Sequence, residues 1–175
     1  MPAWPTRSAL LRHRLPLGYR RLASRSGRDL SLAISNAESA DELLDLHRRH
    51  AGALRSGIHL GNLWNKLGRK RDEIHRNQSF LAARHDELRG LLAQTTSVCD
   101  EGGCDARGLA NIVHGTVRSG LLTFELGRDV HAVCDAVGRS LPPLVAPQFH
   151  PQMTSNACWA FATARPSSKL SLIHI

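Results

Sequence analysis

A helix-like segment recurs in the second half of the chain and limits what the chain can fold into. The two copies occupy residues 105–117 and 151–162. Aligning Asn111 with Asn156 also aligns His114 with Trp159, at an offset of 45 residues. A period in the forties is typical of helical hairpins that stack side by side. The sequence therefore predicts an all-α chain built as an α-solenoid of stacked helical hairpins.

A fainter copy lies earlier, at residues 58–68. Its offset from the middle copy is 49 residues if Asn62 pairs with Asn111, or 50 residues if Trp64 pairs with His114. The sequence alone does not choose between these two frames. The framework residues of the repeat are Trp64, Asn111, His114, Asn156 and Trp159.

Apolar stripes and end signals predict the helices themselves. The expected segments are residues 39–50, 59–70, 79–93, 105–120, 128–141 and 151–165. Ser39 and Glu42 form a capping box, Asp105 suits an N-cap, and Pro151 suits a first helical turn. If the repeat is real, Leu109, Val133 and Phe161 must share one continuous core. We expect this helical-repeat domain to span residues 30–165.

The basic charge of the chain is concentrated at its start. The whole chain carries +8, but residues 1–28 hold seven arginines and no acid, which leaves 16 Lys and Arg against 15 Asp and Glu elsewhere. An acid-free segment rich in Arg, Ser and Leu is typical of an organellar transit peptide. We expect residues 1–28 to be such a peptide and to be disordered, and we expect the location to be the mitochondrion, or alternatively a plastid. A plain basic tail, or wrongly predicted coding sequence, is the other interpretation. No run is long and apolar enough to span a membrane.

The end of the chain matches no repeat. Residues 166–175 are expected to be an unstructured tail, and their sequence is similar to translated sequencing adaptor. We expect the chain to be truncated there, with the last hairpin unfinished. An enzymatic domain beyond residue 175 would be needed for an enzyme, because the chain itself contains no nucleophile motif and no phosphate-binding loop. The sequence predicts no catalytic residue, no metal and no cofactor.

The chain contains four cysteines. Cys134 and Cys158 lie in apolar helical patterns and are expected to behave as small hydrophobes. Cys99 and Cys104 flank a loop with His114 further on, but this spacing is unlike a common zinc site and lacks a fourth ligand. We expect inert thiols and no disulfide framework.

Five cations form a basic cluster, and they are the candidates for contact with the phosphates of RNA: Lys66, Arg69, Lys70, Arg71 and Arg76. With Asp72 and Glu73 the cluster carries +3 over 11 residues. It could attract phosphates, or it could complement a helix C-terminus and keep a turn solvated.

The framework residues also have two interpretations each. The Asn111 and Asn156 amides could read base edges, but a role in tying hairpins together through the backbone is favoured. Trp64 and Trp159 could stack on bases, but a place in the core is favoured. His114 is expected to be a partly buried packing residue.

Several of these segments resemble a known group. Residues 34–46 with 63–68, residues 106–115 and residues 151–162 are similar to repeats of FAST-kinase-like, RAP-associated organellar proteins, of octotricopeptide arrays, and of the domain of the sixth subunit of the RNA-editing substrate-binding complex. His114 and the pair Met153-Thr154 depart from that pattern. The resemblance implies an α-solenoid that binds organellar RNA, messenger or ribosomal, and acts in its processing, stability or editing. The alternative is a protein-interaction scaffold within a ribonucleoprotein complex, without direct RNA contact.

Overall fold

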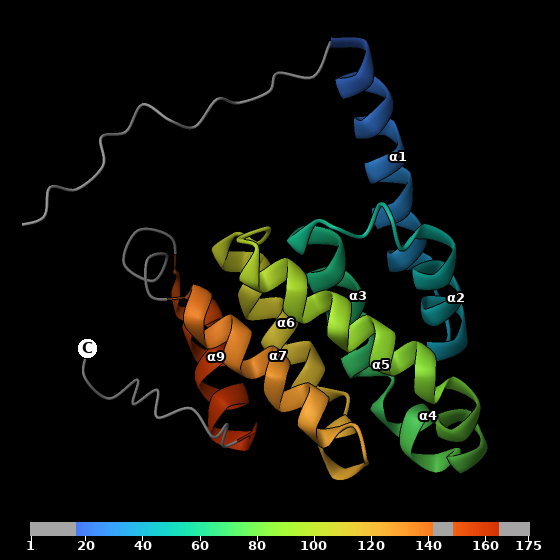
Figure 1. Ribbon diagram of the computed structural model, residues 1–175, viewed down its shortest axis with the longest axis vertical. Helices are drawn as coiled ribbons and strands as arrows, with labels where there is room; N and C mark the ends of the chain where they lie inside the picture. The colour runs from blue at the N-terminus through green and yellow to red at the C-terminus, as the bar shows by residue number, and fades with distance from the viewer. Residues whose placement is uncertain (1–16, 142–148, 165–175) are drawn as a thin grey trace, which may run out of the picture.

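The computed structural model describes residues 17–141 and 149–164, with side chains described from Gly27 onward. All regular structure in these ranges is helical, which confirms the predicted all-α fold (Figure 1). The elements are α1 Leu17–Asn36, α2 Ala40–His50, α3 Gly57–Arg69, α4 Arg71–Arg76, α5 Gln78–Asp100, α6 Ala106–Arg118, the 3₁₀ turn η1 Leu121–Thr123, α7 Gly127–Ser140 and α9 Pro151–Ala164. In the described part of the chain, no helix is long and apolar enough to cross a membrane.

Successive helices alternate between two layers. In one layer α1 packs against α3, α3 lies along α6, and α6 lies along α9 (Figure 1). In the other layer α2 contacts α5, and α5 lies along α7. Each hairpin therefore contributes one helix to each layer, and neighbouring hairpins stack. This packing is consistent with a helical-repeat fold, while an extended solenoid stays a prediction.

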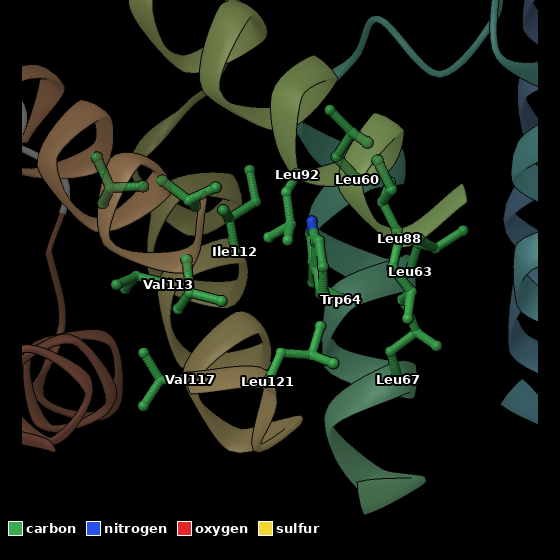
Figure 2. Close-up of a cluster of buried hydrophobic side chains, with 14 of the residues drawn as sticks. Leu60, Leu63, Trp64, Leu67, Leu88, Leu92, Ile112, Val113, Val117 and Leu121 are labelled. Atoms are coloured by element: carbon green, nitrogen blue, oxygen red, sulfur yellow. The ribbon is translucent and has the colours of Figure 1, made fainter. Parts of the chain in front are cut away.

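The core runs continuously between the two layers. Trp64 is fully buried at its centre, among leucines of α3 and α5 and aliphatic side chains of α6 (Figure 2). Leu109 and Val133 are buried in the same core, and Phe161 packs against it. The predicted hydrophobic continuity across the repeats is therefore confirmed, as is the core position of Trp64.

The helix ends follow the local sequence signals. The Ser39 side chain accepts the Glu42 N–H at 3.1 Å, and the Asp105 carboxylate accepts the Gly108 N–H at 2.7 Å. Gly120 follows α6 with a φ of +80°, a conformation that glycine adopts without a steric penalty. These caps satisfy N–H and C=O groups that the first and last helical turns leave unpaired.

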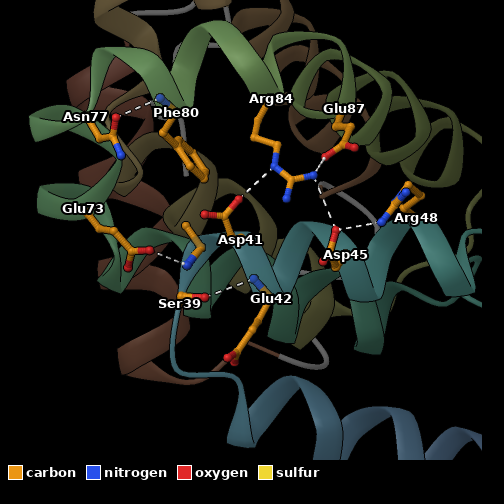
Figure 3. A network of polar contacts seen from close by, with 11 residues as sticks. Ser39, Asp41, Glu42, Asp45, Arg48, Glu73, Asn77, Phe80, Arg84 and Glu87 are labelled. Carbon is orange, nitrogen blue, oxygen red and sulfur yellow. Dashed lines mark hydrogen bonds and ion pairs between the residues drawn. The ribbon is translucent and has the colours of Figure 1, made fainter.

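Ion pairs formed by arginines connect the helices of the layer that contains α2, α5 and α7. Arg84 of α5 contacts Asp41 of α2 at 2.8 Å, Asp45 of α2 at 3.4 Å and Glu87 at 2.8 Å (Figure 3). The hydrogen bond to Asp41 raises the pKa of the Arg84 guanidinium, so it stays charged. In the next pair of helices, two ion pairs repeat this fastening: Arg89 to Asp129 at 3.5 Å, and Arg139 to Asp100 at 2.9 Å.

Small residues line the contact between α3 and α6. A Cβ on Gly61 would lie 3.2 Å from the Asn111 Cβ and from the Gly108 carbonyl oxygen. A Cβ on Gly115 would lie 2.3 Å from the carbonyl carbon of Trp64. The backbones of the two helices thus approach more closely than helices bearing larger residues could.

The contact between α6 and α9 fixes the repeat frame. Ala106 and Ala110 of α6 pack against Met153 of α9. They stand 49 residues after Gly57 and Gly61, the glycines with which α3 meets α6. An offset of 50 would instead place Arg107 there, and Arg107 is exposed. The frame that pairs Asn62 with Asn111 is therefore the one the fold uses.

Several boundaries differ from the predictions. The helix α1 begins at Leu17, so residues 17–28 are helical where disorder was expected. The bounds of the transit peptide and of the repeat domain stay predictions. Leu30 and Ile34 of α1 are buried in the core, which explains why this helix is retained by the fold. The helix α5 continues to Asp100 because Leu91, Leu92, Thr95, Val98 and Cys99 extend its buried side. Residues 1–16 and the predicted tail at 166–175 lie outside the described residues.

Candidate nucleic-acid interface

The exposed side of α6 is narrow. Only Arg107, Asn111, His114 and Arg118 of this helix are not buried. Their spacing of four, three and four residues places them in one stripe along the helix. The remaining residues are covered by α3, α7 and α9, so α6 presents this single stripe to a ligand.

The repeat frame gives the equivalent stripes on the neighbouring helices. They are Ile58, Asn62, Asn65 and Arg69 on α3, and Gln152, Asn156, Trp159 and Thr163 on α9. All of these residues are partly or fully exposed. We call the three stripes together the outer face. One row across it holds an asparagine in each repeat: Asn62, Asn111 and Asn156.

The outer face belongs to helices without acids. No Asp or Glu occurs in α3, α6 or α9, whereas Lys66, Arg69, Arg107 and Arg118 do. Among the described residues, none of these four cations forms an ion pair with a carboxylate, in contrast to Arg84, Arg89 and Arg139 of α5 and α7. No carboxylate of residues 27–141 or 149–164 therefore neutralises their positive charge.

The asparagine side chains are similarly unengaged. Asn62, Asn111 and Asn156 are partly exposed, and none of their amides hydrogen-bonds to another described residue. The favoured prediction, that Asn111 and Asn156 tie hairpins together by hydrogen bonds, is wrong for the part of the chain that the structure describes. The amides can donate to a ligand and accept from it.

An aromatic contact joins α6 to α9 on the outer face. The rings of His114 and Trp159 meet edge to face, with centroids 5.2 Å apart and planes at 63°. Burial lowers the pKa of His114, and the nearby charge of Arg118 lowers it further, so the imidazole is neutral at pH 7. Trp159 is 46% exposed, so its predicted place in the core is wrong. The two tryptophans are not equivalent: in the correct frame Trp64 pairs with Val113, not with His114.

A small hollow lies where the outer face meets α1. Its volume is about 210 Å³, and its lining consists of Ile34, Ser35, Asn62, Asn65, Lys66 and Arg69. Two amides and two cations thus face one space beside α3, while Lys66 also donates to the Ser35 carbonyl at 2.7 Å.

The predicted basic cluster is divided by the structure. Lys66 and Lys70 donate to the carbonyls of Ser35 and Glu38, where α1 ends and the chain turns toward α2. The fold thus uses two of the lysines to satisfy backbone carbonyls beside a helix C-terminus. Arg71 begins α4, and Arg76 ends it, 4.0 Å from Asp72.

Of that cluster, only Arg69 lies in a stripe of the outer face. The fold brings it together with Asn111, His114, Asn156 and Trp159, which the sequence had singled out separately. The sequence analysis did not single out the amide of Asn65 or the cations Arg107 and Arg118, and it named Asn62 only as a possible partner of Asn111 in the repeat frame. The signal that could have found them is the polar stripe of α6, carried to α3 at an offset of 49.

No group of His, Cys, Asp and Glu in the described residues could hold a metal ion. The chain matches no family model, no curated protein and no solved structure. The resemblance to organellar RNA-binding repeat proteins therefore stays a prediction.

Proposed function

We propose that this protein binds single-stranded RNA across the outer face. The observation that carries the proposal is the open stripe of α6, where Arg107, Asn111, His114 and Arg118 are the only accessible residues and no carboxylate competes for the arginines. The accessible side of α6 consists of two cations, an amide and an imidazole. The cations can bind the phosphates of RNA, and the amide and the imidazole can form hydrogen bonds with its bases.

Each kind of side chain has a separate task in this proposal. Arg69, Arg107 and Arg118 would pair with phosphates, which supplies affinity that depends on salt. The Asn111 and Asn156 amides would bond to base edges, which only unpaired bases present to such a surface. Trp159 offers an exposed ring edge and face on which a base could stack.

The first test is binding of a fluorescent, mixed-sequence single-stranded RNA by anisotropy across a salt series. Affinity should fall steeply as salt rises, because bound phosphates release counterions. The double variant Arg107→Ala with Arg118→Ala should bind more weakly. Its log–log salt slope should be smaller by about 1.4 if each arginine meets one phosphate.

A matched control removes two arginines elsewhere. Arg49 and Arg128 are exposed on α2 and α7, in the other layer. Replacing both with alanine lowers the net charge equally but should leave the salt slope unchanged. Absence of RNA binding by the wild-type chain at low salt would rule the proposal out. Equal salt slopes for the two double variants would exclude the outer face as the RNA-binding surface.

A second candidate function is protein binding, and one groove favours it. This groove lies between α5 and the segment before α7, and its volume is about 480 Å³. Leu81, Phe124 and Leu126 give it an apolar floor, while the highly exposed Asp86 and Glu125 lie at its rim. A basic, apolar segment of another protein would fit this combination. A labelled peptide of alternating leucine and lysine should lose affinity for the variant Asp86→Asn with Glu125→Gln.

The cellular location proposed with this function is the mitochondrion, with a plastid as the alternative. The support is the acid-free, arginine-rich composition of residues 1–28, and the proposed role is in processing, stability or editing of organellar transcripts. Residues 1–28 fused to a fluorescent protein should direct it to mitochondria. A fusion that stays in the cytosol would contradict this address without affecting the RNA-binding test.

A further inference from the structure

The connection between α5 and α6 brings two thiols together. Cys99 lies in the last turn of α5 and is buried, and Cys104 lies just before α6 and is partly buried. Their Sγ atoms are 3.9 Å apart, although both cysteines are free. A disulfide bond would need the sulfurs to approach to about 2.05 Å.

The backbone between the two cysteines holds them in place. The Gly103 N–H donates to the Val98 carbonyl at 2.9 Å, and the Gly102 N–H donates to the Cys99 carbonyl at 3.1 Å, with Gly102 at a φ of +72°. This is the glycine-dependent turn that commonly ends a helix. The Gly103 carbonyl in turn accepts the Gly57 N–H at 3.1 Å, which connects the turn to the start of α3. The proximity of the thiols is therefore a fixed feature of the repeat joint.

The two thiols differ in their surroundings. The hydrogen bond from Cys99 lowers the pKa of Cys104, whereas the same contact and burial raise the pKa of Cys99. Partial burial and the negative charge of Asp105, the N-cap of α6, oppose this lowering of the Cys104 pKa but are smaller than the effect of Cys99. Thus the more accessible sulfur is also the better nucleophile, and the buried sulfur lies next to it.

We propose that Cys99 and Cys104 form a two-cysteine redox site that reacts with a low-molecular-weight disulfide of the glutathione type. Cys104 is the sulfur that reacts first, and Cys99 is the resolving thiol. Cys134 is buried, and Cys158 is exposed on α9. Among the described residues, no other cysteine contacts either of them. Those two cysteines serve as internal references.

The reaction has two exchange steps. The Cys104 thiolate attacks one sulfur of the small disulfide, whose S–S bond breaks and releases one thiolate, leaving a mixed disulfide on Cys104. Cys99 then loses its proton and attacks the Cys104 sulfur, which forms the Cys99–Cys104 bond and expels the second small thiolate. The two protein thiols are oxidised by two electrons in total, and the small disulfide is reduced to two thiols.

The test uses the full chain, reduced and then exposed to oxidised glutathione, with remaining thiols blocked by iodoacetamide. Trypsin releases Cys99 and Cys104 together on the peptide of residues 90–107, and Cys134 and Cys158 on other peptides. We expect peptide 90–107 to lose two hydrogens and to take up no iodoacetamide. In the variant Cys99→Ala, glutathione should remain attached to Cys104, whereas in Cys104→Ala the buried Cys99 should stay reduced.

The outcomes decide between this site and unassisted thiols. If peptide 90–107 of the wild-type chain is fully alkylated at a time when Cys158 carries glutathione, the proposal is overturned. If Cys99→Ala leaves Cys104 unmodified under the same conditions, the assigned order of attack is wrong. Circular dichroism of each variant checks that it is folded, and Cys99→Ser provides a second substitution if alanine disturbs the core. The wild-type result depends on no variant.

Discussion

Gly115 of α6 lies directly against the backbone of Trp64 in α3. A Cβ at Gly115 would stand 2.3 Å from the Trp64 carbonyl carbon and 2.4 Å from its carbonyl oxygen. Real side chains do not approach a backbone so closely, and neither helix can yield without moving the other. This contact, together with those of Gly57, Gly61 and Gly68, therefore helps to set how far apart α3 and α6 lie, and with it the spacing of their stripes on the outer face.

Replacing Gly115 with alanine should destabilise the protein by about 3 kcal/mol, because the helices must separate and the core beneath them loses contacts. Chemical denaturation monitored by circular dichroism measures this. Gly90 of α5 is the matched control, since a Cβ there would meet nothing within 4 Å. Gly90→Ala should stabilise the fold by about 0.5–1 kcal/mol through helix propensity. Equal effects at both positions would mean that the α3–α6 contact is looser than described.

The indole of Trp64 has one polar atom, and the core supplies one partner for it. Its Nε1–H donates to the Thr95 hydroxyl at 2.8 Å, and that hydroxyl donates to the Leu91 carbonyl at 2.7 Å. Thr95→Val keeps the shape but leaves the indole N–H unpaired in a dry site, which should cost about 1–3 kcal/mol. Thr96→Val, which removes only a hydroxyl bonded to the Leu92 carbonyl, should change the free energy of unfolding by less than about 0.5 kcal/mol. Urea titrations of both variants compare the two values.

The sequence was sufficient for most of the helices in the described residues and for the all-α fold class. Apolar residues at helical spacing mark the side that faces the core, and Leu60, Leu63, Trp64 and Leu67 are all buried as that spacing predicts. The frame of the repeat could not be obtained in this way. It depends on which small residues meet across helices, and Gly61 or Gly115 carries no such information until the partner helix is placed. The α1 helix was missed because its arginines resemble those of a targeting segment. Only a few apolar residues, among them Leu30 and Ile34, bury it in the core.

The candidate site was only partly predictable for a related reason. Charge density along the chain pointed to Lys66 and Lys70, yet both lysines donate to backbone carbonyls near the end of α1. Arg107 and Arg118 are isolated in the sequence, and only stacking places Arg118 beside the end of α3 that carries Arg69, while Arg107 lies at the other end of α6. Cations that are close in the sequence can serve turns and helix ends, as Lys66 and Lys70 do, and need not contact a ligand. The outer face, by contrast, exists only once α3, α6 and α9 lie side by side.

The lowered pKa of His114 predicts a pH dependence of stability. Its ordinary pKa is near 6.5, and burial, followed by the charge of Arg118, lowers the value in the folded state. The unfolded chain therefore binds the proton first as pH falls. The contribution of His114 to stability is present above pH 6.5 and is lost as pH decreases from there through the folded-state pKa.

The free energy of unfolding of the wild-type chain, relative to His114→Gln, should thus decrease between pH 7 and pH 5. The variant Arg118→Ala should show a smaller decrease, because one of the two causes is removed. Denaturant titrations at several pH values measure both differences. A wild-type curve parallel to that of His114→Gln over this range would contradict the assignment.

Substitution of Trp159 distinguishes most clearly between an effect on RNA binding and an effect on the stability of the fold. With 46% of its surface exposed and no place in the core, its loss should have little effect on stability, but it should weaken single-stranded RNA binding if a base stacks on it. Alanine at this position should cost about 1–3 kcal/mol of binding free energy, and Trp159→Phe should retain most of the affinity. Leu32→Ala is the control, because Leu32 is a similarly exposed apolar residue, 60% accessible, on α1 outside the outer face. Anisotropy titrations at constant salt give the affinities, and thermal unfolding checks the fold. A loss of stability that matches the loss of affinity, or equal affinities for Trp159→Ala and Leu32→Ala, would exclude Trp159 from the interface.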